Sequence, residues 1–259
     1  MISKPENWDK IADKEQKSPY IDKILGIYKR EEHIKLINKW MGKLSNIKIL
    51  KTDLHEEALG SDHILFHLAG QDNAVFAIDI SQKIVDKAKE RAEQYGIDAH
   101  NYIAADVRHL PFEESLFDLV ISTSTLDHFP EKDLKTSLSG LKRVLKPDGI
   151  LILTVNNKQN YNFFIMLKLG RLLRIIPYPV KFYSREEISD IAEGTGFIVE
   201  ETASIVHIPC PLNKMLILGK KLISSKIIDK WTSRSINIFK KSAKGYRTAW
   251  FIALKLRKT

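Results

Sequence analysis

The spacing of apolar residues changes near residue 45 of the chain. Before that point, apolar side chains between residues 21 and 40 recur at roughly every 3.6 positions, which predicts helices. After it, short runs rich in Val, Ile and Leu alternate with longer stretches of helical spacing. The short runs, which we interpret as strands, are 47–50, 74–79, 101–106, 117–123 and 149–156. The helical stretches between them are about 55–69, 81–95 and 131–146.

Strands that alternate with helices of this length predict parallel βαβ units with right-handed crossovers. The runs are apolar at nearly every position, which is typical of strands buried on both faces. We therefore expect an α/β fold whose mostly parallel sheet is doubly wound. Local signals agree: Ser81 is a suitable N-cap for the second helix, Gly96 a suitable end for it, and "KPDG" at 146–149 a suitable turn.

The last third of the chain adds further elements to this pattern. A capped helix is expected within 184–197, followed by a strand at 198–209 and a final strand at 246–257. Basic, largely helical insertions are expected at about 160–183 and 210–245. An insertion between late strands would lie at the rim of the sheet, where substrate lids are built.

We interpret residues 46–259 as one α/β domain and residues 1–45 as an N-terminal helical lid. Tyr20 could belong to this lid, although packing in the core is the simpler role. The first residues lack the apolar core of a signal peptide, and no apolar run reaches the 18 residues or so of a membrane span. We therefore expect a cytoplasmic protein.

Charge is distributed unevenly along the chain. The formal net charge is +9, yet from Ile205 to the end 13 Lys and Arg residues accompany one acidic residue, Asp229, giving +12. The rest of the chain carries 28 basic and 31 acidic side chains, giving −3. Such asymmetry favours an anionic partner, either a lipid surface or nucleic acid, or else a solvated helix face. The single Cys210 excludes a disulfide framework and a cysteine-based zinc site, and we expect no metal site.

Acidic residues follow two of the expected strands. In open α/β sheets, ligands bind beyond the carboxyl ends of the strands. Asp79 ends the second strand, where a carboxylate can accept both hydroxyls of a ribose; the alternative is a favourable charge at a helix N-terminus. Asp106 follows the third strand and could accept from an exocyclic amine, with Val107 packing on an adenine face.

Three motifs give the chain a family resemblance: "AIDIS" with Asp79, "AADVRHLPFEESLFDLVIS" with Asp106, and "LKRVLKPDGILILTV". Over about residues 45 to 200 the chain resembles the class I S-adenosylmethionine-dependent methyltransferases, most of all the branch that modifies small molecules, quinones and lipids. The resemblance implies a Rossmann-like sheet of seven strands with the last antiparallel. It also implies S-adenosylmethionine as cofactor, held by Asp79 and Ile80 at the ribose and by Asp106 and Val107 at the adenine. Ser122, in the fourth strand, would also meet the cofactor.

The turn after the first strand departs from that family. Its members carry a glycine-rich loop there, whose backbone N–H groups meet the carboxylate of the cofactor. This chain has "KTDLHEE" at 51–57 instead. Lys51 or Thr52 could bind the carboxylate, while Asp53, Glu56 or Glu57 could bind the ammonium. The alternative is a turn that has lost its ligand.

Candidate chemistry follows the fourth strand in "STSTLDHFPEKD". Asp127 and His128 are the candidates for a general base, and the pKa of histidine lies near neutral. Methyl transfer is a direct SN2 displacement on an activated sulfonium, for which alignment alone supplies much of the acceleration. A structural role for His128 therefore stays open.

The apolar segment 161–183 is interrupted by basic residues, and the segment 212–231 repeats this composition. Such stretches are typical of helices lying in a membrane interface, or of a buried lid. We expect a hydrophobic small molecule, quinone or lipid as substrate, and an anionic membrane surface as a partner. Nucleic acid is not expected, because no RNA-binding module is present. The alternative function is a catalytically inactive scaffold of the same fold; a nicotinamide-dependent enzyme is disfavoured by the missing GxGxxG.

Overall fold

The computed structural model describes most of the chain. The described residues are 5–17, 23–42, 44–61, 63–172, 180–208, 230, 232, 234–236, 238 and 245–258. Tyr20 and Cys210 lie outside them, as do residues 173–179 of the first expected insertion and most of the second. Within the described part of the chain, no helix is both long and apolar enough to cross a membrane.

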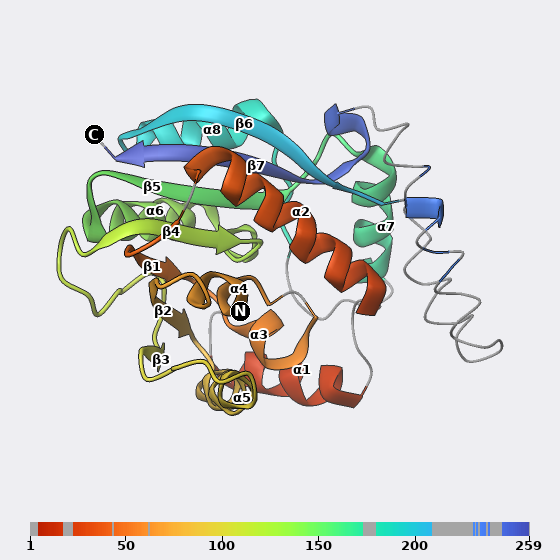
Figure 1. Cartoon of the computed structure of the whole chain (residues 1–259). Coiled ribbons are helices and arrows are strands. Elements are labelled where there is room, and N and C mark those ends of the chain that lie inside the picture. The colour runs from red at the N-terminus through yellow and green to blue at the C-terminus, as the bar shows by residue number, and fades with distance from the viewer. Residues whose placement is uncertain are drawn as a thin grey trace.

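Seven strands form one sheet in the order β3-β2-β1-β4-β5-β7-β6 (Figure 1). β7 runs antiparallel to both of its neighbours, whereas the pairs among β1 to β5 are parallel. The Rossmann-like sheet with an antiparallel last strand is therefore confirmed. The strands are β1 (Lys48–Lys51), β2 (Ala74–Asp79), β3 (Tyr102–Ala104), β4 (Phe117–Thr123), β5 (Leu145–Asn156), β6 (Phe197–His207) and β7 (Ala249–Lys258).

Helices surround this sheet close to the positions that the sequence predicts. They are α1 (Pro5–Lys17), α2 (Lys23–Met41), α3 (His55–Leu59), α4 (Ile64–Ala69), α5 (Gln82–Gln94), α6 (Glu131–Val144), α7 (Tyr161–Leu172) and α8 (Arg185–Gly194), with short 3-10 turns η1 (Leu126–His128) and η2 (Gly245–Arg247). Ser81 caps α5 by accepting from the Ile84 N–H at 3.1 Å, as expected.

The prediction of one continuous helix over 55–69 is wrong. The backbone at Gly60 is extended, with ψ −164°, so the first helix ends there and the second begins at Ile64. The carboxylate of Glu57 accepts from the Leu65 N–H at 3.1 Å, which satisfies a donor in the first turn of α4. The start of α4 after the break is therefore stabilised by a side chain of α3.

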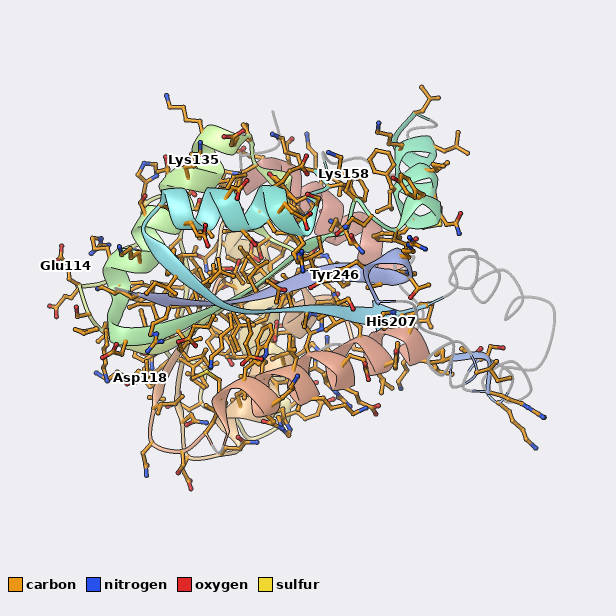
Figure 2. The ribbon with its side chains drawn as sticks, turned by 90° about the horizontal axis from the view of Figure 1, so that it is seen from above. Glu114, Asp118, Lys135, Lys158, His207 and Tyr246 are labelled. Carbon is orange, nitrogen blue, oxygen red and sulfur yellow. The ribbon has the colours of Figure 1, made fainter. Side chains whose placement is uncertain are left out.

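The two faces of the sheet are covered by different helices (Figure 2). Successive side chains along a strand point to opposite faces. Ile49, Ile121 and Ile152 pack in a core with residues of α2 and α4, whereas Leu50 and Val120 pack in a second core with α6 and α8. This double burial explains why the strands are apolar at nearly every position.

α1 lies against the N-terminal end of α5. The Ser81 hydroxyl donates to the Asp9 carboxylate, and Lys83 forms an ion pair with Asp13. α1 also contacts α3. The helix that begins the described chain is therefore docked beside the carboxyl ends of β1 and β2, where the sequence leads us to expect a ligand.

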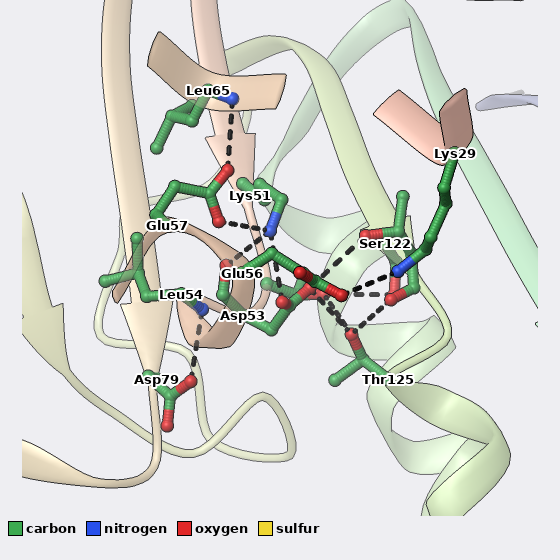
Figure 3. Close-up of polar contacts among 12 residues, drawn as sticks. Lys29, Lys51, Asp53, Leu54, Glu56, Glu57, Leu65, Asp79, Ser122 and Thr125 are labelled. Carbon is green, nitrogen blue, oxygen red and sulfur yellow. Dashed lines mark hydrogen bonds and ion pairs between the residues drawn. The ribbon is translucent and has the colours of Figure 1, made fainter. Parts of the chain in front are cut away.

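The turn between β1 and α3 is built around a buried lysine (Figure 3). The ammonium of Lys51, at the end of β1, donates to Glu57 Oε2 at 2.8 Å, to Asp53 Oδ1 at 3.1 Å and to the Asp53 carbonyl at 2.8 Å. The side chains of Lys51 and Glu57 are 1% and 0% exposed. Burial alone would lower the pKa of Lys51, but Asp53 and Glu57 raise it above its ordinary value. The lysine therefore stays charged, and it ties β1 to α3 and, through Glu57, to α4.

Replacing Lys51 with methionine is expected to destabilise the fold by about 3–5 kcal/mol, because the buried Glu57 carboxyl would lose its cation and would either stay ionised alone or take up a proton, each at a cost. The free energy of unfolding, measured by urea denaturation, checks this. The double variant Lys51→Met/Glu57→Gln should recover at least half of the loss, because the neutral amide introduced at position 57 can still accept from the Leu65 N–H. Equal stability of the single variant and the wild type would contradict this account of the turn.

Candidate functional site

The carboxyl ends of β1, β2 and β4 open onto a cavity of about 180 Å³. Its polar wall comes from the turn after β1, the end of β2 and the loop after β4. Its apolar wall comes from α7 and β7, and α1 and α2 contribute one residue each. The cavity therefore lies where open α/β sheets bind their ligands.

Asp79 ends β2 and lines the cavity with its side chain nearly buried. Oδ2 accepts from the Leu54 N–H at 3.1 Å, and Oδ1 accepts from the Ser81 N–H at 2.9 Å. Burial raises the pKa of Asp79 to about 6, although these two N–H groups oppose the shift. Each oxygen keeps a lone pair, so the carboxylate can accept two further donors from the cavity.

Asp53 and Thr52 begin the turn after β1 and line the cavity together. Asp53 Oδ2 accepts from the Thr125 hydroxyl at 3.0 Å, in the loop after β4. The Thr52 hydroxyl donates to Ser122 Oγ at 3.0 Å, which ties the turn to β4 from below. The turn that replaces the expected glycine loop is thus fixed to the neighbouring strand by side-chain hydrogen bonds (Figure 3).

A second ion pair lies in the cavity wall itself. Lys29 of α2 reaches Glu56 of α3, with Nζ 2.9 Å from Oε1 and side-chain exposures of 11% and 17%. Burial would raise the pKa of Glu56, but Lys29, His55 and Lys51 together lower it to about 2. Glu56 is therefore ionised at any physiological pH, and the pair presents one positive and one negative group side by side.

His128 and Asp127 follow β4 in η1, and His128 Nε2 lies 3.9 Å from Asp127 Oδ1. His128 lines the cavity, and its ring meets Trp8 of α1 edge to face at 5.3 Å between centroids. Asp127 is fully buried. Its carboxylate accepts from the Ser124 hydroxyl and the Asn156 backbone N–H, each at 3.0 Å, and from the side-chain amide of Asn156. Burial raises the pKa of Asp127. Asp127 thus holds the turn that carries His128.

Aromatic and aliphatic side chains form the other end of the cavity. Phe163 and Leu167 lie one helical turn apart on α7, and Trp250 and Phe251 come from the start of β7. The Phe163 and Trp250 rings stack at 4.7 Å and 12°. This end of the cavity offers apolar contact to a ligand rather than hydrogen bonds.

The sequence-predicted site residues divide into three groups. Residues that line the cavity are Thr52, Asp53, Glu56, Asp79, Ile80 and His128. Residues buried beneath it are Lys51, Glu57, Ser122 and Asp127, all fully buried or nearly so. Among the described residues, Asp106 and Val107 do not line this cavity: Val107 packs in the core beside α6, and the Asp106 carboxylate is bound by the Arg108 backbone N–H and guanidinium at 2.5–3.0 Å.

Sequence reasoning missed several residues of the cavity, notably Trp8, Lys29, Phe163 and Trp250. Lys29 carries a signal in retrospect, because it lies on the apolar face of α2 with Leu25 and Leu36. A cation at a core position of an amphipathic helix needs a partner. The aromatic pair carries no local signal, because the two rings are far apart in the chain.

The chain is similar to known methyltransferases in sequence. Residues 55–153 match a family model described as a methyltransferase domain. Identity is 26% over 149 residues to the ubiquinone/menaquinone biosynthesis C-methyltransferase of Haemophilus ducreyi, covering 50% of this chain and 57% of that protein. It is 30% over 140 residues to the 2-phytyl-1,4-naphtoquinone methyltransferase of Trichormus variabilis, covering 51% and 59%. The chain thus spans little more than half the length of these relatives.

A solved structure shares the fold across most of the chain. The geranyl diphosphate C-methyltransferase from Streptomyces coelicolor A3(2), in complex with Mg²⁺, geranyl diphosphate and S-adenosyl-L-homocysteine, superposes with a TM-score of 0.57 at 14% identity, covering 88% of this chain and 78% of that one. The matched segment, these relatives and the Rossmann-like sheet together support a class I S-adenosylmethionine-dependent methyltransferase, the family that the sequence motifs resemble.

Proposed function

We propose that this chain transfers a methyl group from S-adenosylmethionine to a hydrophobic small molecule, quinone or lipid. The observation that carries the proposal is one cavity with two chemically different ends. Asp79 and the charged turn after β1 form the polar end, and Phe163 and Trp250 form the aromatic end. A polar cofactor and an apolar acceptor would meet where these ends join.

The polar end fits the cofactor by the chemistry of its side chains. The Asp79 carboxylate would accept the two ribose hydroxyls with the lone pairs that Leu54 and Ser81 leave unused. Asp53 would face the ammonium of the amino-acid end. For Asp106 to accept from the adenine amine, Arg108 would have to give up one of its hydrogen bonds, since both carboxylate oxygens already accept two.

The aromatic end fits a prenylated or otherwise apolar acceptor. Flat and extended apolar groups pack well on stacked aromatic rings. Two relatives are named for quinone methylation, and the solved structure is that of a prenyl diphosphate methyltransferase. These names support the class of acceptor proposed here.

The cofactor supplies an activated methyl group, and the chain's residues align the acceptor and manage its proton. His128 would serve as general base, since it faces the cavity and an imidazole nitrogen can accept a proton from the acceptor. Asp127 would act indirectly, by holding η1 in place through Ser124 and Asn156. Alignment of the reacting atoms would supply much of the acceleration.

We also propose that the outer face of α7 contacts an anionic membrane surface. Tyr161, Ile165, Leu169 and Leu172 are 72%, 60%, 51% and 78% exposed and recur at helical spacing, and exposed Lys168 lies between them. Apolar side chains exposed together mark interaction surfaces. The opposite face of α7 lines the cavity, so a membrane-borne acceptor would have a short path. The basic C-terminal segment would add attraction to anionic lipid.

Calorimetric titration tests the cofactor assignment. Wild-type protein should bind S-adenosylmethionine, and Asp79→Asn should weaken that binding at least tenfold at pH 7.5, because hydrogen bonds to a charged group are worth about 1.5–3 kcal/mol. No binding to a folded wild type would favour the inactive-scaffold alternative.

The same titration should depend on pH. In the free protein the pKa of Asp79 is raised from 3.8 to about 6. The folded state therefore loses stability as pH rises from the lower value through the higher one, where Asp79 ionises. Ribose hydroxyls donate to the ionised form, so affinity should be constant above about pH 7 and fall below pH 6, by nearly tenfold per unit. Asp79→Asn should remove this dependence; an unchanged pH profile in the variant would assign it to another group.

Phe163→Ser should weaken binding of a short-chain prenylated naphthoquinone about tenfold or more, because a buried aromatic contact of about 1.5–3 kcal/mol is lost. Quenching of tryptophan fluorescence measures this, since Trp8 and Trp250 line the cavity. Affinity for S-adenosylmethionine should stay within about twofold. Phe164→Ser is the matched control, because Phe164 is adjacent but does not line the cavity. Equal effects of the two variants would contradict an acceptor site at Phe163.

Ile165→Ser/Leu169→Ser should reduce sedimentation with vesicles containing anionic phosphatidylglycerol, because the variant removes exposed apolar side chains without changing the charge. Binding to vesicles of neutral phosphatidylcholine should be weak for both proteins. Wild-type protein that fails to sediment with anionic vesicles would contradict the membrane proposal and leave the cofactor proposal intact.

A further inference from the structure

The ion pair between Lys29 and Glu56 has a location that stability alone does not explain. It joins α2 to α3 across 27 residues of sequence and lies in the cavity wall, with Nζ and Oε1 2.9 Å apart. A largely buried ion pair adds little stability compared with apolar residues of the same volume. An ion pair at this place is better explained by a ligand whose charges it matches.

The carboxylate of the ligand proposed for this cavity needs a cationic side chain as partner, and Lys51 is not placed to be that partner. Its ammonium makes three hydrogen bonds beneath the cavity, to Glu57 and Asp53. Among the described residues that line the cavity, Lys29 is the one lysine or arginine. Lys29 therefore replaces the cation that the sequence pattern led us to expect at Lys51.

The surroundings of Glu56 are shaped for its present orientation. A Cβ added at Gly60 would lie 1.8 Å from Glu56 Oε2, so only glycine leaves room for the carboxylate there. Gly60 also donates its backbone N–H to the Glu56 carbonyl at 2.9 Å. Asp53, a second carboxylate, lines the same polar end of the cavity.

We propose that Lys29 and Glu56 form a clamp for the amino-acid end of S-adenosylmethionine. The cofactor carboxylate binds the Lys29 ammonium, and the cofactor ammonium binds Glu56 and Asp53. Each charge of the cofactor zwitterion would meet the opposite charge of the Lys29–Glu56 pair. Every charged group that loses contact with water therefore has a partner when the ligand binds. This clamp rests on the proposed function and names the groups that replace the backbone N–H donors of a glycine loop.

Three probes separate the two ends of the cofactor. S-adenosylmethionine carries both charges of the amino-acid end, decarboxylated S-adenosylmethionine keeps the ammonium alone, and 5′-methylthioadenosine has neither. In the wild type, decarboxylated S-adenosylmethionine should bind at least tenfold more weakly than S-adenosylmethionine. This comparison needs no variant, so it holds even if a substitution disturbs folding.

Lys29→Met should lower the affinity for S-adenosylmethionine at least tenfold and change the affinity for 5′-methylthioadenosine by no more than about twofold. Gly60→Ala should produce the same split, because it displaces the Glu56 carboxylate without removing a charge. Lys35→Met is the control, since Lys35 lies on the same helix, is 60% exposed and pairs with Glu32 on the surface. Affinities by calorimetry and unfolding midpoints should be measured for every variant.

The outcomes distinguish the clamp from the function on which it rests. If Lys29→Met and Gly60→Ala lower the affinities for all three probes equally, or lower none of them, the clamp is overturned while cofactor binding stands. The clamp also fails if the wild type binds S-adenosylmethionine no more tightly than 5′-methylthioadenosine. A wild type that binds none of the probes overturns the proposed function, and the clamp with it.

Discussion

The buried ammonium of Lys51 is the contact on which the rest of the site depends. A lysine without exposure to water needs compensating charge, and here Asp53 and Glu57 supply it. Those bonds fix the backbone of the turn after β1 and, through Glu57, the start of α4. Thr52 and Asp53 then reach β4 from a fixed position. A glycine loop shapes its ligand site with backbone conformation; this turn does so with a side-chain network.

That substitution changes how the polar end of the cavity is made. In the wall of the cavity, charged side chains come from Asp53 in the turn after β1, Asp79 on β2, Glu56 on α3 and Lys29 on α2, which meet only in the folded chain. The acidic end of β2 stays in the place where the family's ribose-binding residue is expected. The fold thus matches that of the resembled family, while in the proposed clamp the contacts to one part of the ligand come from side chains and not from the backbone.

The sequence predicts the parallel part of the sheet because short apolar runs alternate with stretches of helical spacing. The total of seven strands and the antiparallel direction of the last one are implied by the family resemblance carried by the motifs around Asp79 and Asp106. The break at Gly60 has a signal in "GSD" at 60–62, a helix stop followed by N-cap residue types, but the apolar spacing that continues to Ala69 masks it. Lys51 was expected in the ligand site because a charge at a strand end is normally exposed to ligand. Its burial depends on α4, which the pattern did not separate from α3.

Among the residues that the structure describes, the polar end and the aromatic end line one and the same cavity. A single molecule that joins an adenosine group to an apolar chain through a linker of suitable length would therefore fill both ends at once. Once one group is bound, the other would bind at the high effective concentration set by the linker. The affinity of the linked molecule would therefore exceed that of either half. Under the proposed function, a cavity of this kind would be a target for bisubstrate inhibitors, and the linker length that binds best would report the separation of the two ligand groups.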